Sequence, residues 1–256
     1  MNAPDSKFEP RIVGGEAVNI EAYPFAVQFL NMGRLCGGVI INSWSIVTAG
    51  HCLAFSTDMK QMIIQAGAKY TYDFNADRYR VRAFVIHEDY NKEQAFSCDI
   101  ALVFVDTPIK LGPRAKKGIL VNHKEWMNDK EENFIVTGWG YTKHKGEVSK
   151  VGLKMARLHY INPRECSKFL DGHNITADTF CLYGYGERDT CQGDSGGGVL
   201  WNNMLVGLTS YGEGCAVKGK PSIYANIWHL RSWIIKRVND FVEQFCDSKF
   251  RFKETV

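Results

Sequence analysis

The stretch with the strongest chemical signal is TCQGDSGGG at residues 190–198, where Ser195 stands between Asp194 and a run of glycines. Glycine costs chain entropy and contributes no packing, so a glycine cluster indicates a sharp turn or a close approach of the backbone. Such a turn can leave backbone N–H groups pointing outward beside the serine hydroxyl. The stretch is therefore either a nucleophile next to an anion-binding loop or an ordinary surface turn.

Two other stretches supply the partners that a serine nucleophile needs. VTAGHC places His51 before Cys52, and SCDIALV places Asp99 at the start of an apolar run. Taken alone, His51 fits a structural role as well as the role of a base. Asp99 taken alone fits a turn residue at the end of a strand. Together they match a chemical requirement, because a neutral imidazole must take the hydroxyl proton and a buried carboxylate must fix the tautomer of that imidazole.

Short β-rich runs must position these residues. Between Phe25 and Val105 they are FAVQFL, GGVIINSWSIVTA, MIIQAG, YRVRAFVIH and IALVFV, and after a Lys-rich connector they resume as FIVTGWG, KMARLHYI, GVLWNN, MLVGLTSYG and SIYANI. This spacing is typical of an antiparallel sandwich or barrel. The last segment instead has apolar residues at helical spacing, which predicts an amphipathic helix docked on the core. Those residues are Ile227, Leu230, Trp233, Ile234, Val238, Phe241, Val242 and Phe245.

Composition excludes some classes of function. The chain has 256 residues, enough for a large core, and its net charge of +3 with scattered Lys and Arg predicts no nucleic-acid partner. No apolar run is long enough to span a bilayer, so no membrane association is expected. MNAPDSKFEP lacks the basic and apolar regions of an export signal, so any such signal is expected to have been removed or never included.

The 8 cysteines predict disulfides, because none forms a CxxC pair and metal ligands usually come in close pairs with histidine. An even set of widely spaced cysteines favours an oxidising compartment, so we expect a secreted, extracellular protein. The sequon Asn174-Ile175-Thr176 fits that location and predicts glycosylation of Asn174 in a surface loop.

The motifs RIVGG, TAGHC, DIAL, GWG, TCQGDSGG and SYG together resemble those of the trypsin-like (chymotrypsin-fold, S1-type) serine proteases, from Ile12 to the C-terminal helix. The resemblance implies a serine endopeptidase with an all-β fold, in which two antiparallel six-stranded β-barrels pack together with a C-terminal α-helix. The ranges it implies are an activation peptide at 1–11, an N-terminal barrel at 12–118, a C-terminal barrel at 119–226, and a helix and tail at 227–256.

The resemblance also implies roles for the residues singled out above. Ser195 would be the nucleophile, His51 the general acid and base, and Asp99 the residue that orients His51. The backbone N–H groups of Gly193 and Ser195 would form the oxyanion hole.

RIVGG implies a zymogen. Cleavage after Arg11 would free the α-amine of Ile12, which would insert beside the carboxylate of Asp194 and order the oxyanion loop. A buried charge pair can act as a switch of this kind even where its net contribution to stability is small. The alternative is that Arg11 merely begins a strand.

The same resemblance predicts specificity. Asp189 stands at the position of the carboxylate that selects Lys or Arg, and Ser210, Tyr211 and Gly212 match the segment that lines the slot and pairs with the substrate backbone. A carboxylate at the bottom of a narrow apolar slot binds an extended cation well, because desolvation strengthens the pairing. We therefore expect cleavage after Lys or Arg.

The sequence departs from the family pattern at several places, among them Tyr211, which replaces a common tryptophan. Ser222 stands where trypsins usually have glycine, so its hydroxymethyl group is expected to narrow the pocket, reduce turnover and shift the preference toward Lys. Gly198 replaces the proline that commonly ends GDSGGP, and the lost restriction on φ costs on the order of 1 kcal/mol. These departures leave a second interpretation, a non-catalytic protease homologue that binds partners through the same fold.

By resemblance, three disulfides are expected: Cys36–Cys52, Cys166–Cys181 and Cys191–Cys215. Elimination leaves Cys98 with Cys246, and the alternative is two free thiols.

Many trypsins bind calcium in a loop that corresponds to about residues 68–80. Here only Asp73 and Asp77 remain as ligands, with Arg78 and Arg80 nearby, so no metal and no other cofactor is expected. The expected partners are protein or peptide substrates, an activating protease and protein inhibitors, and the chain is expected to be a monomer.

Overall fold

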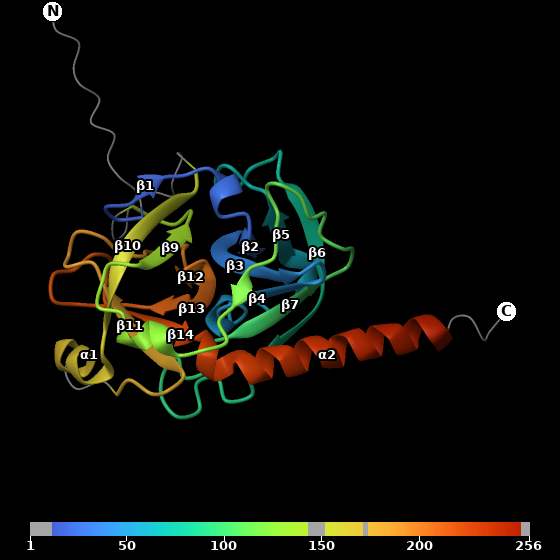
Figure 1. The fold of residues 1–256 in the computed structure, drawn as a ribbon. Helices are drawn as coiled ribbons and strands as arrows, with labels where there is room; N and C mark the ends of the chain where they lie inside the picture. Colours follow the sequence, from blue (N-terminus) through green and yellow to red (C-terminus); the bar gives the residue numbers. More distant parts are fainter. Residues whose placement is uncertain (1–11, 143–151, 171–173, 252–256) are drawn as a thin grey trace, which may run out of the picture.

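The strands of the first half of the chain close into a barrel (Figure 1). The computed structural model describes residues 12–142, 152–170 and 174–251. The barrel has the antiparallel order β2-β3-β4-β7-β6-β5, and β5 pairs with β2 to close it. Its strands are β2 (Ala26–Asn31), β3 (Arg34–Asn42), β4 (Ser45–Thr48), β5 (Met62–Ala66), β6 (Asp77–Ile86) and β7 (Ala101–Val105).

A second barrel follows with the order β10-β11-β14-β13-β12-β9, and the pairing of β9 with β10 closes it. Its strands are β9 (Phe134–Gly138), β10 (Lys154–Ile161), β11 (Thr179–Tyr183), β12 (Gly198–Trp201), β13 (Met204–Tyr211) and β14 (Ser222–Asn226). β1 (Glu16–Ala17) lies within the range predicted for the first barrel but pairs with β10, and β8 (Ile119–Leu120) runs parallel to β13. The helices are α1 (Pro163–Phe169) and α2 (Ile227–Arg251), with single 3-10 turns at Ile20–Ala22, Gly50–Cys52, Met59–Gln61 and Glu125–Asn128.

Side-chain alternation explains the strands. In β6, Tyr79 is buried while its neighbours Arg78 and Arg80 are exposed, as expected for a strand with one face in the barrel. β7 is buried on both faces, because Val103 faces the core inside the first barrel and Leu102 belongs to the larger core shared by the two barrels. The interface between the barrels is therefore hydrophobic core.

Helix α2 starts at the second barrel and runs along the first (Figure 1). Leu230 and Ile234 are buried, and the ring of Phe241 stacks on Phe104 of β7 with centroids 4.0 Å apart. The two six-stranded barrels and the C-terminal helix predicted from the sequence are confirmed. No helix among the described residues is long and apolar enough to cross a membrane.

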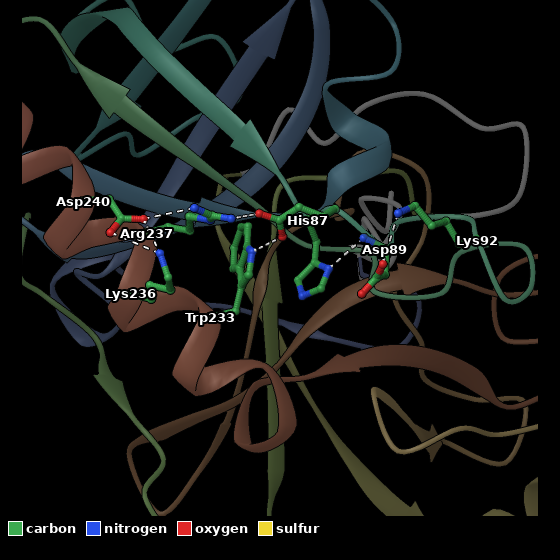
Figure 2. Close-up of polar contacts among 8 residues, drawn as sticks. His87, Asp89, Lys92, Trp233, Lys236, Arg237 and Asp240 are labelled. Carbon is green, nitrogen blue, oxygen red and sulfur yellow. Dashed lines mark hydrogen bonds and ion pairs between the residues drawn. The ribbon is translucent and has the colours of Figure 1, made fainter.

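Polar contacts fix α2 to the segment that follows β6 (Figure 2). The Trp233 ring lies 4.9 Å from that of His87, and its Nε1–H donates to Glu88 Oε2 at 2.6 Å. Arg237 pairs with Glu88 and, at 3.0 Å, with Asp240. The helix is thus attached to the start of the segment that leads to Asp99.

Three of the predicted disulfides are confirmed: Cys36–Cys52, Cys166–Cys181 and Cys191–Cys215. The predicted bridge between Cys98 and Cys246 is wrong, because Cys98 has a free thiol. The Cys98 N–H donates to the carboxylate of Asp178, whose carbonyl accepts from the Asn226 N–H, so Cys98 lies near the start of α2. Cys246 lies five turns further along that helix, about 28 Å away at 1.5 Å per residue, whereas a disulfide needs Cα atoms within about 7 Å.

Candidate active site

His51 and Asp99 are joined by two hydrogen bonds. The His51 Nδ1 lies 2.8 Å from Asp99 Oδ2, and the His51 backbone N–H donates to Oδ1 at 2.9 Å. His51 lies on the 3-10 turn after β4, and Asp99 is buried directly before β7. The carboxylate accepts a hydrogen bond from Nδ1–H, so the neutral ring has its lone pair on Nε2, as a general base requires.

The hydroxyl of Ser210 also donates to Asp99 Oδ2. Ser210 belongs to β13 of the second barrel, whereas Asp99 precedes β7 of the first. The sequence placed Ser210 only in the substrate slot. The structure gives it a second contact that holds the carboxylate toward His51 across the barrel interface.

The glycines after Ser195 allow its loop to pack tightly beside His51. Gly196 has a φ of 78°, and a Cβ there would lie 2.2 Å from Thr48 Oγ1 on β4, the strand that leads to His51. The Ser195 carbonyl accepts from the Gly37 N–H at 2.7 Å and lies 3.6 Å from Cys52 Sγ. Ser195 is therefore held against the first barrel at the disulfide next to His51.

The Asp194 carboxylate is completely buried behind this loop. Oδ1 accepts from the Gly140 N–H at 2.7 Å, and Oδ2 accepts from the Cys191 N–H at 2.9 Å. Burial raises the pKa of Asp194 to about 7. A Cβ on Gly138 would lie 2.0 Å from Oδ1, so the GWG motif, to which sequence reasoning gave no role, makes room for this carboxylate.

The segment around Ile12 lies against the same loop. Ile12 is 1% exposed, and the Val13 carbonyl accepts from the Asp189 N–H at 3.2 Å. Arg11 lies outside the described residues. The chain directly after the predicted cleavage point therefore reaches the 189–194 loop.

On one side of Ser195 lies the specificity slot, a hollow of about 160 Å³. Its lining is Thr190, Cys191, Gln192, Ser195, Thr209, Ser210, Tyr211, Gly212, Gly214 and Ser222. Asp189 is 6% exposed, and Ser222 Oγ donates to its Oδ1 at 2.7 Å. Backbone N–H groups of Thr190 and Ala216 also donate to this carboxylate. Burial outweighs these bonds and raises the pKa of Asp189 to about 6.

Comparison with known proteins identifies the family of this chain. The family model described as Trypsin matches residues 12–234. The chain belongs to the trypsin family.

Among relatives, the trypsin-family chain is 32% identical over 235 residues to trypsin of Sarcophaga bullata, covering 90% of each. It is 33% identical over 233 residues to hypodermin-A of Hypoderma lineatum, covering 90% of this chain and 88% of that protein. Among solved structures it is similar to neuropsin, a serine protease expressed in the limbic system of mouse brain. That similarity has a TM-score of 0.77 and 26% identity, covering 88% of this chain and 98% of the other.

Sequence reasoning missed Phe96 at the site of this trypsin-family chain. Its ring stacks on Tyr211 at 4.6 Å and meets the His51 ring edge-on at 5.7 Å. Phe96 has a φ of 62°, which its N–H bond to Asn91 Oδ1 supports. A single phenylalanine between Ala95 and Ser97 gave no pattern that could have revealed this contact.

The predicted absence of calcium can be examined at Asp73. Its carboxylate accepts from the N–H groups of Lys69, Tyr70 and Asn75, which help lower its pKa against the opposing effect of burial. These oxygens therefore already have donors within the loop. Asn174 is exposed, as its predicted glycosylation requires, and the modification itself stays a prediction.

Proposed function

We propose that this member of the trypsin family is a secreted serine endopeptidase that cleaves after Lys or Arg and is made as a zymogen. The observation that carries the proposal is the position of Ser195. Ser195 lines the specificity slot in front of Asp189. Its carbonyl lies against the Cys36–Cys52 disulfide, next to His51, which is hydrogen-bonded to the buried carboxylate of Asp99. These contacts support a single site in which a nucleophile, a base and a carboxylate for a cationic side chain act together.

The mechanism follows from these contacts. Ser195 Oγ attacks the carbonyl carbon while His51 Nε2 takes its proton, and the carboxylate of Asp99 stabilises the resulting imidazolium. Backbone N–H groups of Gly193 and Ser195 bind the oxyanion. His51 then gives the proton to the leaving amine, an acyl-enzyme remains, and water hydrolyses it with His51 again as the base. Gly193 supports this role because its φ of 94° is one that glycine adopts without strain.

The activation step is supported by the position of the chain around Ile12. A new α-amine at Ile12 would be a cation close to the buried Asp194 carboxylate, whose pKa is raised while it has no cationic partner. Pairing the two charges would stabilise the ionised carboxylate and the loop that carries Gly193. Secretion is supported by the three disulfides, which persist in oxidising compartments.

Hydrolysis of a small peptide amide ending in Lys or Arg tests the proposal, before and after limited cleavage at Arg11, with a serine-directed covalent inhibitor as titrant. We expect activity only after cleavage, with one inhibitor bound per chain on Ser195. Ser195→Ala is the matched control and should show neither labelling nor turnover. Correct cleavage without labelling or turnover would contradict the proposal and favour the non-catalytic homologue.

A further inference from the structure

A second hollow, of about 440 Å³, also reaches Ser195 and shares only Gln192 and Ser195 with the lining of the specificity slot. Its lining is Gly33, Arg34, Leu35, Cys36, Phe55, Tyr72, Tyr141, Gln192, Gly193 and Ser195. A peptide whose Lys or Arg fills the slot and whose carbonyl faces Gly193 must continue through this hollow on its leaving-group side. We call it the leaving-group hollow.

Arg34 is the cation of the leaving-group hollow. Its Cζ lies 4.4 Å from the centroid of the Phe55 ring, so the guanidinium is held over an aromatic face. Arg34 is exposed, and no described carboxylate lies within ion-pair distance of it. No acidic residue is among the described residues that line the hollow. The N–H groups of a stacked guanidinium remain free to bind a carboxylate in two-point fashion.

The surroundings of Arg34 are fixed before any substrate arrives. It follows a two-residue turn between β2 and β3, in which Met32 and Gly33 both have positive φ, as a tight hairpin requires. The Tyr72 hydroxyl donates to the Gly33 carbonyl at 3.2 Å. On the other side, the buried Asn31 amide donates to the carbonyl groups of Cys52 and Ser56, which holds the loop that carries Phe55.

The strand geometry shows which substrate residue Arg34 can reach. The Ser195 carbonyl is bonded to the Gly37 N–H, and Arg34 precedes Gly37 by three residues on β3. Three residues of strand span about 10 Å. An extended peptide covers the same distance in about three residues, so its second or third residue after the scissile bond comes level with Arg34.

We propose that Arg34 selects substrates with Asp or Glu at the second or third position after the scissile bond. This inference rests on the proposed endopeptidase function and names its substrate class. The site would favour a sequence with Lys or Arg before the cleaved bond and an acidic residue shortly after it.

Matched internally quenched peptides test this, differing only in Glu or Gln at the second or third residue after a common Lys. For the activated chain we expect kcat/KM about two- to fivefold higher for Glu, since an exposed pair contributes modestly, and the difference should shrink as salt rises. Arg34→Gln should abolish the preference, and Arg34→Glu should reverse it toward Lys at that position. Arg78→Gln should keep it, because Arg78 stacks on Phe74 outside the hollow.

A Lys amide with a dye as leaving group has no residue after the bond, and all these variants should cleave it equally. Equal rates for Glu and Gln peptides in the unaltered chain, or an unchanged preference in Arg34→Gln, would overturn the inference. If even the dye amide is not cleaved, the proposed function fails instead. The inference is then still decided by peptide binding to Ser195→Ala, where the Glu peptide must bind more tightly and Arg34→Gln must remove the difference.

Discussion

The hydroxyl of Ser222 donates a hydrogen bond to the carboxylate of Asp189 at the base of the specificity slot, with Oγ 2.7 Å from Oδ1. Ser222 lines the slot, whereas Asp189 lies behind the lining. A Cβ on Gly212 would lie 2.7 Å from Ser222 Oγ, so this hydroxyl also narrows the passage between the slot walls. A substrate cation therefore meets Ser222 before or together with Asp189.

Ser222→Gly should raise kcat/KM for Arg substrates more than for Lys substrates. The broad guanidinium needs more room than the ammonium group, and a misfit of one heavy atom or two is worth about 1–3 kcal/mol. We expect the Arg-to-Lys ratio of kcat/KM to rise by about tenfold or more, measured with matched amide substrates. Ser222→Ala separates the effect of Cβ from that of the hydroxyl, because it keeps Cβ and loses Oγ. An unchanged ratio in Ser222→Gly would contradict the steric argument.

Binding of a small aromatic amidine should depend on the ionisation of Asp189. Burial raises its pKa to about 6, and the carboxylate attracts a cation only when it is ionised. The dissociation constant should therefore be constant above pH 6 and rise by about tenfold per pH unit well below it. The Ser222 bond lowers this pKa, so the midpoint in Ser222→Gly should move to higher pH. A pH-independent dissociation constant from pH 4 to 8 would contradict this prediction.

Asp194 gives the uncleaved chain a pH-dependent stability. Its pKa is about 7 when folded and 3.8 when exposed, so the folded chain binds more protons between these values. The contribution of Asp194 to the free energy of unfolding is fully present below pH 3.8 and is lost as the pH rises through 7. The expected loss is on the order of a few kcal/mol. Urea unfolding of Arg11→Gln, which resists activation, should reveal it, and the cleaved chain should show a smaller loss because the Ile12 amine then pairs with Asp194. Equal losses in both forms would contradict the pairing.

The sequence predicted those features that depend on residue type and motif. Strand patterning and the family motifs gave the barrels, and the cysteine spacing with those motifs gave three of the bridges. The features it could not predict depend on what fills the space around a residue. The bond from Ser210 to Asp99 spans both barrels, and the stacking of Phe96 on Tyr211 joins residues far apart in the chain. The free thiol of Cys98 follows from the length of α2, which separates it from Cys246, whereas pairing the two remaining cysteines by elimination takes no account of distance.

Gly198 shows how such surroundings reverse a prediction. From the sequence, a proline here restricts φ and should stabilise the chain by on the order of 1 kcal/mol. In the structure a Cβ at Gly198 would lie 2.8 Å from Val39 Cγ2 and 2.9 Å from Leu205 Cδ1, in the core between the barrels. We expect Gly198→Ala and Gly198→Pro to destabilise by about 1–3 kcal/mol in urea unfolding. Gly112→Ala, where a Cβ meets nothing within 4 Å, is the matched control. A Gly198→Pro variant more stable than the unaltered chain would contradict this prediction and show that the core side chains move to admit the ring.

The docking of α2 should depend on its aromatic contact more than on its ion pairs. Phe241 stacks on buried Phe104, and Phe241→Ala should lower the free energy of unfolding by about 2 kcal/mol, less than for a fully buried ring. Trp233→Phe keeps an aromatic ring beside His87 and removes the N–H bond to partly exposed Glu88, so it should cost about 1 kcal/mol. Ile235→Ala, at an exposed position of the same helix, should be nearly neutral.

Activity separates these structural roles from an effect on the site. Glu88 lies in the segment that leads from β6 to Asp99, but the His51–Asp99 bonds and the Ser210 contact fix the Asp99 carboxylate independently of α2. Trp233→Phe should therefore keep kcat/KM within about twofold for a small Lys amide at a temperature where it is folded. A larger loss in kcat/KM, with unfolding unchanged, would mean that α2 positions Asp99 through Glu88.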